Sequence, residues 1–216
     1  MSYLFLDTPQ QEFLYRLDKL FLQEKGFCLF GGTALAFYYE HRESEDFDFM
    51  TNQIFESDTI INKMLQKFPD ITVHMMQKNT IDMRWNGVKV SFFGGDPYMK
   101  ISPIQKFAGL DLYSKPDIMA MKIAAILKRN TLRDYFDLAY AIRAEYSVQD
   151  ILEFFRDRFQ EKACPFPDEL IYKILLYTDD IPADTIDVLQ EKEYWGADMN
   201  FTLKRTTEIF LNQIKG

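Results

Sequence analysis

Two aspartates separated by one residue, Asp46 and Asp48, are the side chains of this sequence best suited to bind a metal ion. On a strand, residues i and i+2 project from the same face, so both carboxylates would point one way while Phe47 and Phe49 face a core. Adjacent carboxylates repel each other unless a cation lies between them. Hard oxygen ligands of this kind suit Mg²⁺ that also contacts nucleotide phosphates. The pair therefore predicts a metal site, the alternative being a solvated strand end that carries two acids.

A pair of glycines, Gly31-Gly32, precedes Asp46 with thirteen residues between them. Because glycine has no Cβ, its backbone can bend tightly and come close to a phosphate. Thr33 follows at the expected start of a helix, where free N–H groups and the helix dipole favour an anion. The glycines make metal and phosphate binding the favoured interpretation of Asp46 and Asp48.

The first half of the chain is predicted to form an α/β (α+β) core. The pattern indicates a helix from Thr8 to Gly26, a strand at 27–30, a helix, and the strand that carries Asp46. A helix at about 58–68 and strands at 71–77, 80–85 and 88–93 follow, and Asn86-Gly87 is a strong hairpin signal. We expect a mixed sheet of about five strands flanked by helices, with a loop at 94–97 and no further strand before Ser114.

The second half is predicted to be helical. Ser114-Lys115-Pro116-Asp117 is a helix start, and further helices are expected at about 131–144, 147–159, 168–177 and 202–214. The expected division is therefore an α/β core at 1–110 and a helical C-terminal region at 111–216 that packs on it.

Composition limits the class of protein. The formal net charge is −8, which argues against an extended surface that wraps nucleic acid. Cys28 and Cys164 have no metal-ligand spacing and are expected to be reduced thiols. No signal peptide and no apolar run of membrane-spanning length is apparent. We therefore expect a cytoplasmic protein with no membrane partner.

The glycine pair and the aspartate pair together resemble the signature of polymerase-β-type nucleotidyltransferases. The wider segment GGTALAFYYEHRESEDFDF resembles the AbiEii/AbiGii-type nucleotidyltransferases, the toxin halves of some bacterial abortive-infection and toxin–antitoxin pairs. This resemblance implies Mg²⁺-dependent transfer of a nucleoside monophosphate from a nucleoside triphosphate to an acceptor hydroxyl. It further implies RNA, such as a tRNA end, as the acceptor, and a separately encoded antitoxin as a partner.

The segment PDIMAMKIAAILKRNTLRDYFDL resembles a second signature of that family. The resemblance implies that Lys122, Arg133, Asp134 and Asp137 face the nucleotide, with Arg129 as a further match. By spacing alone, Lys122 and Arg129 would be ordinary basic residues on one helix face. Asp134 could instead be an acid at a helix start that pairs with Arg133 or Arg129.

The loop before the metal strand is also part of the resemblance, which implies that His41, Arg42 and Ser44 order it. Ser44 is included among the expected nucleotide-binding residues. His41 on its own is expected to cap the carbonyl groups at a helix end.

One departure bears on catalysis. Polymerase-β-type enzymes place a third carboxylate on a later strand, and here the corresponding position holds Ser91. Serine is a poor proton acceptor near neutral pH, and Asp82 across the hairpin is a candidate substitute. The alternative function is therefore a catalytically impaired domain that binds a nucleotide or a partner protein. A third alternative is transfer of a nucleotide to a protein hydroxyl.

Overall fold

The computed structural model describes residues 3–163, 166–183, 185–196 and 198–215. The described chain divides into two compact units. The first, here called the sheet unit, comprises Met1–Tyr38, Ser44–Met99 and Pro103–Tyr113. The second, the helical unit, comprises Tyr39–Glu43, Lys100–Ser102 and Ser114–Gly216. The predicted domain boundary at residue 110 stays a prediction.

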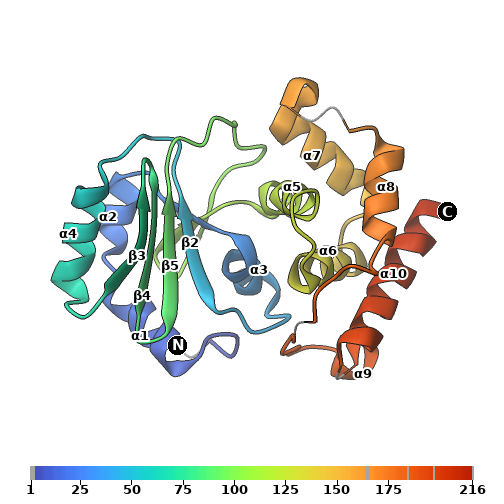
Figure 1. Ribbon diagram of the computed structural model, residues 1–216, viewed down its shortest axis with the longest axis horizontal. Coiled ribbons are helices and arrows are strands. Elements are labelled where there is room, and N and C mark those ends of the chain that lie inside the picture. The colour runs from blue at the N-terminus through green and yellow to red at the C-terminus, as the bar shows by residue number, and fades with distance from the viewer. Residues whose placement is uncertain (1–2, 164–165, 184, 197, 216) are drawn as a thin grey trace. The chain divides into compact units, whose positions relative to one another are not determined.

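The sheet unit is built on a mixed seven-stranded sheet with strand order β3-β4-β5-β2-β1-β7-β6. Its strands are β1 Cys28–Phe30, β2 Asp46–Met50, β3 Thr72–Gln77, β4 Thr80–Trp85, β5 Val88–Phe93, β6 Gln105–Phe107 and β7 Leu110–Leu112. Its helices are α1 Thr8–Arg16, α2 Lys19–Glu24, α3 Gly31–Tyr39, whose last residue belongs to the helical unit, and α4 Ser57–Lys67. In Figure 1, α2 and α4 lie on one side of the strands and α3 lies on the other.

The predicted fold class is confirmed, but the expected number of strands was too low. The two missed strands, β6 and β7, lie in the stretch that the pattern left without structure. β7 pairs in parallel with β1, so it extends the sheet on the side of the glycine pair. The hairpin from β4 to β5 has the predicted bounds. Its turn residues Asn86 and Gly87 both have positive φ, as this kind of tight turn requires.

The predicted single N-terminal helix is in fact two. Asp7 caps α1, because its side chain accepts from the Gln10 N–H while the Gln10 side chain accepts from the Asp7 N–H at 2.7 Å. Leu17 is extended and Asp18 caps α2, accepting from the Phe21 N–H at 3.1 Å. The apolar residues recur at helical spacing through this stretch without a break. Asp18 nevertheless caps a new helix, so α1 ends before it and α2 begins after it.

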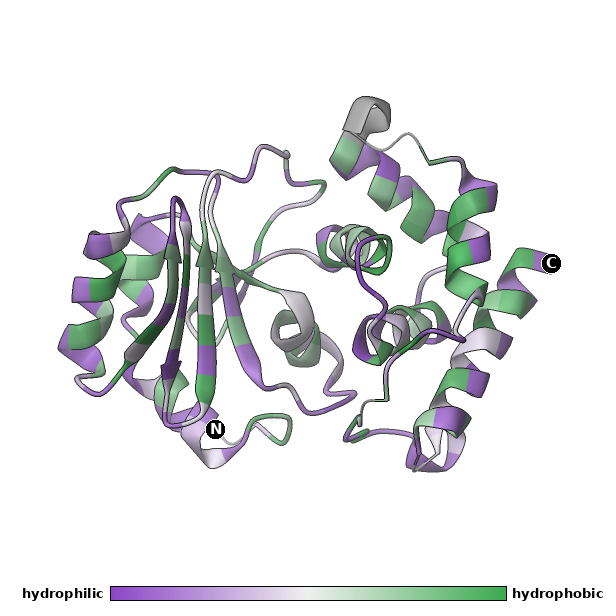
Figure 2. Ribbon diagram, viewed as in Figure 1, coloured by the Kyte–Doolittle hydropathy of each residue, from purple (hydrophilic) through white to green (hydrophobic). Residues whose placement is uncertain are grey.

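One face of the sheet forms the core beneath α1 and α4. Phe13 of α1 lies 5.1 Å from Phe47 of β2 between ring centroids and stacks on Phe68, which in turn meets Trp85 of β4. Hydrophobic and hydrophilic residues alternate along several strands in Figure 2. Strand residues next to these buried aromatics therefore project from the opposite face, and Asp46 and Asp48 are among them.

The helical unit contains α5 Lys115–Ile126, α6 Leu132–Ala144, α7 Val148–Ala163, α8 Asp168–Leu176, α9 Lys192–Trp195 and α10 Met199–Lys215. α5 packs against α6 and α7, and α10 packs against α6 and α8. Ser114 caps α5 as predicted, accepting from the Asp117 N–H at 3.2 Å. The short helix α9 was not expected from the sequence.

Cys28 is a buried free thiol in β1, as expected, and Cys164 lies outside the described residues. No helix of the described chain is both long and apolar enough to cross a membrane.

Candidate functional site

Asp46 and Asp48 share one face of β2. The residues between and after them, Phe47 and Phe49, are fully buried, whereas both aspartates are partly exposed. Asp48 lies opposite Phe30 of β1 on one side and Ser91 of β5 on the other. The strand therefore presents two carboxylates side by side, as the sequence predicted.

Gly31 brings the backbone of the glycine pair against Asp48. It follows β1 directly, begins α3 and has φ of +76°. A Cβ at this position would lie 3.3 Å from Oδ2 of Asp48. A side chain would thus fill the space beside the carboxylate and strain the backbone. Gly32 is the second residue of α3, in the first turn where N–H groups have no partner within the helix.

These residues fit a magnesium ion with a bound phosphate. Two carboxylates on one face are hard oxygen ligands, and Mg²⁺ is commonly held by one or two carboxylates together with substrate phosphates. The narrow space that glycine leaves beside Asp48 is where a phosphate could reach both the helix N-terminus and such an ion. Among the described residues, no group of three or more His, Cys, Asp or Glu side chains could hold a metal ion, so Mg²⁺ at this pair would need further oxygen ligands from phosphate or water.

Thr33 and Ser44 fasten the start of α3 to the start of β2. The Thr33 hydroxyl donates to the carbonyl oxygen of Asp46 and lies 2.6 Å from Oγ of Ser44. Gln10 Nε2 donates to the Ser44 carbonyl oxygen at 2.5 Å. Both hydroxyls are buried, so their visible role is to position Asp46. Direct contact of Thr33 or Ser44 with a nucleotide stays a prediction.

The position expected to hold a third carboxylate lies in a row of paired residues that crosses three strands. Asp48 of β2 pairs with Ser91 of β5, which pairs with Asp82 of β4. Registered neighbours project from one face, so all three side chains share the face of the metal ligands. Ser91 is 1% exposed, and neither its Oγ nor Oδ1 of Asp82 has a hydrogen-bond partner among the described residues. The register thus places Ser91 where the acid was expected and Asp82 one strand further.

Asp137 is the centre of a buried charge cluster in the helical unit. It accepts from Nε and NH2 of Arg42 at 2.7 and 2.8 Å, from Nε2 of His41 at 2.8 Å, and lies 2.5 Å from Nζ of Lys122. Lys122 also donates to Asp134 at 2.8 Å. All five side chains are buried, and only a paired charge is tolerated in such surroundings.

The electrostatics of the cluster keep Asp137 and Lys122 ionised. Burial raises the pKa of Asp137, but the charges of Arg42 and Lys122 outweigh it and hold that pKa well below its usual range. Burial lowers the pKa of Lys122, but Asp134 and Asp137 more than compensate and raise it. Burial, together with the charges of Arg42 and Lys122, outweighs the effect of Asp137 and lowers the pKa of His41, so its imidazole is neutral at neutral pH.

His41 differs from the expectation that it would cap a helix end. A neutral ring that donates its Nε2–H to Asp137 carries no proton on Nδ1, and that nitrogen has no partner in the described chain. The prediction was wrong because Asp137 is 96 residues away, beyond the reach of any local spacing rule. The Arg42–Asp137 pair was missed for the same reason.

Asp134 forms an ion pair with Arg129, as expected from its interpretation as an acid at a helix start. It accepts from Nε of Arg129 at 3.2 Å and from the Thr131 hydroxyl at 2.6 Å, in addition to Lys122. Burial raises the pKa of Asp134, but Lys122, Thr131 and Arg129 together outweigh that effect and the pKa is lowered. Arg129 is largely exposed and Arg133 is half-buried. Nucleotide contact by these residues stays a prediction.

The predicted site residues thus form two groups. Those of the sheet unit are Gly31, Gly32, Thr33, Ser44, Asp46 and Asp48. Those of the helical unit are Lys122, Arg129, Arg133, Asp134 and Asp137. Within the first group, the structure joins Gly31 to Asp48 and Thr33 to Ser44 and Asp46; within the second, it joins Lys122, Asp134 and Asp137 directly.

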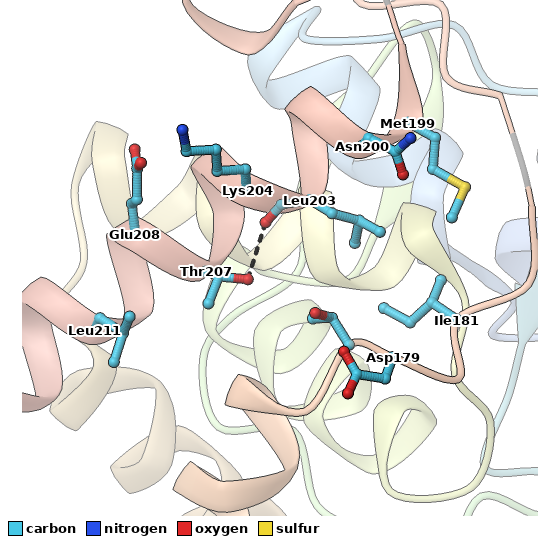
Figure 3. A pocket seen from close by; sticks show the side chains of 10 residues that line it. Asp179, Ile181, Met199, Asn200, Leu203, Lys204, Thr207, Glu208 and Leu211 are labelled. Carbon is cyan, nitrogen blue, oxygen red and sulfur yellow. Dashed lines mark hydrogen bonds between the residues drawn. The ribbon is translucent and has the colours of Figure 1, made fainter.

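A separate hollow of about 560 Å³ lies in the helical unit beside α10. Figure 3 shows Lys204, Glu208 and Asp179 around it together with apolar Leu203 and Ile181. Thr207 donates to the Leu203 carbonyl oxygen at 2.9 Å within it. It contains none of the predicted site residues, so we assign it no part in the reaction proposed below.

The profile of the family described as "Nucleotidyl transferase AbiEii toxin, Type IV TA system" matches residues 12–207. The chain belongs to this family. The match includes both signature segments, so the resemblance seen in the sequence is confirmed. A relative from Aquifex aeolicus (strain VF5), the uncharacterized protein aq_aa25, is 26% identical over 190 residues, which are 86% of this chain and 89% of that protein.

Solved structures share the fold of this AbiEii family chain. Two crystal structures of Helicobacter pylori chains, one of them JHP933, are 17% identical to it with TM-scores of 0.57 and 0.56. Each match covers 95% of this chain, together with 93% of the first Helicobacter pylori chain and 90% of the second. MenT4, a nucleotidyltransferase toxin from Mycobacterium tuberculosis H37Rv, is 14% identical with a TM-score of 0.54, over 95% of this chain and 82% of MenT4.

Proposed function

We propose that this AbiEii family chain is a Mg²⁺-dependent nucleotidyltransferase that moves a nucleoside monophosphate from a nucleoside triphosphate to an acceptor hydroxyl. The observation that carries the proposal is the close approach of Gly31, at the start of α3, to the carboxylate of Asp48 on the strand that also carries Asp46. Membership of a nucleotidyltransferase toxin family supports it.

The residues divide the chemistry between them. Gly31 and Gly32 would bind the phosphate tail through their backbone, and Asp46 and Asp48 would hold the metal ion. Mg²⁺ bound there would neutralise charge on the transferring phosphate. The acceptor oxygen forms a bond to the α-phosphorus, the bond to pyrophosphate breaks, and the hydroxyl proton must pass to a base. Lys122, Arg129 and Arg133, with Asp134 and Asp137, are proposed to complete the nucleotide site.

The biological setting is proposed from the family. The chain would act in the cytoplasm as the toxin of a toxin–antitoxin or abortive-infection pair, with RNA, such as a tRNA end, as the acceptor. A separately encoded antitoxin would be its partner. MenT4, a nucleotidyltransferase toxin of similar fold, is consistent with this role.

Calorimetric titration tests the nucleotide site. Each of the four nucleoside triphosphates is titrated with and without Mg²⁺ into the wild type, the Asp46→Asn/Asp48→Asn variant and an Asp58→Asn/Asp70→Asn variant. The last loses the same charge at two exposed positions of the sheet unit. Mg²⁺-dependent binding that only the first variant loses is the expected result. Absence of binding by the wild type would contradict the proposal.

A second function has one observation in its favour. Ser91 occupies the row position of the third carboxylate, and its Oγ has no partner among the described residues. This favours a domain that binds a nucleotide or a partner without efficient turnover. Label from an α-phosphate-labelled nucleotide would appear on RNA for the proposed enzyme, on protein for a protein acceptor, and on neither for the impaired domain.

A further inference from the structure

Strand β3 forms one edge of the seven-stranded sheet, and in the described chain no strand pairs with its outer side. In Figure 1 it lies beside α4. Every residue of β3 except Met75 is exposed, and its sequence TVHMMQ contains no lysine, acidic residue or proline. Such residues commonly keep an open edge from pairing with another chain. The opposite edge, β6, has only three residues and contains Lys106. Of the two edges, β3 is therefore the one able to accept a further strand.

Apolar side chains are exposed along this edge. Val73 pairs with Met83 and Met76 pairs with Ile81, and both residues of β4 are fully buried in the core beneath α4. Registered neighbours share a face, so Val73 and Met76 continue that core to the edge, where they are 43% and 57% exposed. Met76 also lines a hollow of about 430 Å³ together with Ile54, which is 70% exposed. Val73, Met76 and Ile54 form an apolar rim, and exposed apolar side chains that lie together mark interaction surfaces.

A β-bulge determines how a partner strand would have to pair with β3. The register between β3 and β4 shifts between Val73 and Met75, so His74 is an additional residue. Val73 and Met76 consequently share a face although they are three positions apart, and they flank the bulge on either side. A bulge that faces a regular strand disrupts the ladder. A second β3 that runs antiparallel and is centred on the bulge has the same additional residue at the same place, so both halves of the ladder stay in register.

The side chains of the two strands are complementary in this pairing. Val73 of one copy lies opposite Met76 of the other, and a two-fold axis repeats the contact, so each strand covers the other's exposed apolar side chains. Asp70 precedes the strand and Lys78 follows it, and both are exposed. The pairing brings Asp70 of each copy within one position of Lys78 of the other. Opposite charges therefore meet at both ends of the ladder.

Helix α4 repeats this charge complementarity. The Ser57 hydroxyl donates to the Gln77 carbonyl oxygen at 3.4 Å, so α4 begins beside the end of β3 and runs back toward its start. Its first turn contains Asp58 and its last turn Lys67, and both are exposed. A two-fold axis through the bulge directs the acidic start of one α4 toward the basic end of the other. A second copy of this chain thus matches the edge in charge, in bulge position and in apolar side chains.

We propose that two copies of this chain associate through β3 about this two-fold axis and join their sheets into one continuous sheet. The contact is isologous, because the same residues of both copies form it. It is small, so we expect a dissociation constant of about 10–100 µM and a monomer near about 1 µM. β4 and β5 lie between β3 and β2, the strand that contains Asp46 and Asp48. The inference therefore does not rest on the proposed reaction, and nucleotide binding should not depend on the association.

Sedimentation equilibrium of the full chain between about 1 and about 300 µM measures the association. The variants are Met76→Lys and Leu20→Lys, which introduce the same charge at residues that are 57% and 65% exposed, the second on α2. Met76→Lys should weaken dimerisation by at least about tenfold, because the axis introduces the lysine twice at the paired edge. Leu20→Lys should associate as the wild type does. Equal thermal midpoints by circular dichroism show that both variants are folded.

Two further experiments test the register. Lys78→Asp should weaken association, and Asp70→Lys/Lys78→Asp, which exchanges the two charges, should restore it. Val73→Cys and Met76→Cys mixed under oxidising conditions should form a disulfide-linked dimer at least about tenfold faster than either alone, because opposed Cβ atoms lie about 4.5–5.5 Å apart. The wild type, which keeps Cys28 and Cys164, gives the background rate.

Three results would overturn the inference. A wild type that remains monomeric at about 300 µM has no such contact. A Met76→Lys variant that associates as the wild type does assigns the contact to another surface. Cross-linking that is equally fast in the mixture and in either cysteine variant alone contradicts the pairing centred on the bulge. None of these results bears on nucleotide binding, which the calorimetric titration measures separately.

Discussion

Gly31 lies so close to Asp48 that a Cβ at position 31 would come within 3.3 Å of Oδ2 of the carboxylate. The two residues are 17 positions apart and are brought together because Phe30, next to Gly31, pairs with Asp48 across β1 and β2. Strand pairing thus places a glycine backbone against one of the two expected metal ligands. The same pairing explains why the glycine pair and the aspartate pair have to occur together in the sequence.

Replacing Gly31 by alanine should damage the site more than the fold. A non-glycine residue at positive φ costs about 1–2 kcal/mol, and the added methyl group would also crowd Asp48. Gly87→Ala is the matched control, because Gly87 has φ of +86° but nothing within 4 Å of an added Cβ. We expect similar losses of unfolding free energy in both variants, measured by urea denaturation.

Only Gly31→Ala should weaken Mg²⁺-dependent nucleotide binding, by about tenfold if the crowding costs roughly 1.4 kcal/mol. Calorimetry of both variants measures this difference. Equal nucleotide affinity in the two would show that the space beside Asp48 is not used by the phosphate.

Asp137→Asn should strongly destabilise the helical unit. The substitution leaves Arg42 and Lys122 buried without their shared counter-charge, and breaking a buried pair in this way costs about 3–5 kcal/mol. The control is Glu12→Gln, which breaks the exposed Glu12–Arg16 pair of α1 and should cost less than about 1 kcal/mol. Thermal denaturation followed by circular dichroism measures both. An Asp137→Asn variant as stable as Glu12→Gln would show that the charge cluster contributes little to the stability of the folded protein.

The stability of the protein should fall on mild acidification because of His41. Its pKa is lowered in the folded state by burial, so below its unfolded value of about 6.5 the unfolded chain binds the extra proton. Stability is then lost as pH falls from there toward the folded pKa, by up to about 1.4 kcal/mol per pH unit. Asp134 and Asp137 act lower: their contribution is complete above about pH 4 and is lost as pH falls below it.

His41→Gln separates the two effects, because glutamine can still donate to Asp137 but does not titrate. The unfolding free energy of this variant, from urea denaturation between about pH 7.5 and about pH 5.5, should change little with pH. His74→Gln removes the other histidine, which is exposed on β3, and should keep the wild-type slope. A His41→Gln variant with the wild-type slope would assign the pH dependence to another group.

Local patterns predicted the part of the fold that local physics determines. Asn86-Gly87 can adopt positive φ at both turn positions, so the hairpin bounds followed from the sequence. The turn between β6 and β7 has the same backbone signs but uses Ala108 and Gly109, with φ of +52° and +79°. Alanine at such a position is unusual, and β6 is exposed throughout with three residues. The turn therefore lacked the usual sequence signal, and the alternation of Leu110, Asp111 and Leu112 in β7 was too short, at three residues, to indicate a strand.

The candidate site likewise has a part that local spacing predicted and a part that it did not. Asp46, Asp48 and the glycines lie within one short strand–helix–strand segment, so their spacing alone predicted how they meet. Arg42 and Asp137 are 95 residues apart, and their pairing depends on how α6 packs rather than on any period. The row from Asp48 through Ser91 to Asp82 likewise became visible only through the pairing of β2 with β5 and of β5 with β4. Parallel pairing joins distant strands, and sequence spacing carries no record of its register.

Two buried serines make a last matched comparison. The Ser44 hydroxyl lies 2.6 Å from Oγ1 of Thr33, whereas the Ser91 hydroxyl has no partner in the described chain. Ser44→Ala should therefore lower the unfolding free energy by about 1 kcal/mol. Ser91→Ala should raise it by up to about 1 kcal/mol, because an unpaired buried hydroxyl is itself unfavourable. Urea denaturation of both variants measures the two signs, and a destabilised Ser91→Ala would show that this hydroxyl has a partner, such as an ordered water, in solution.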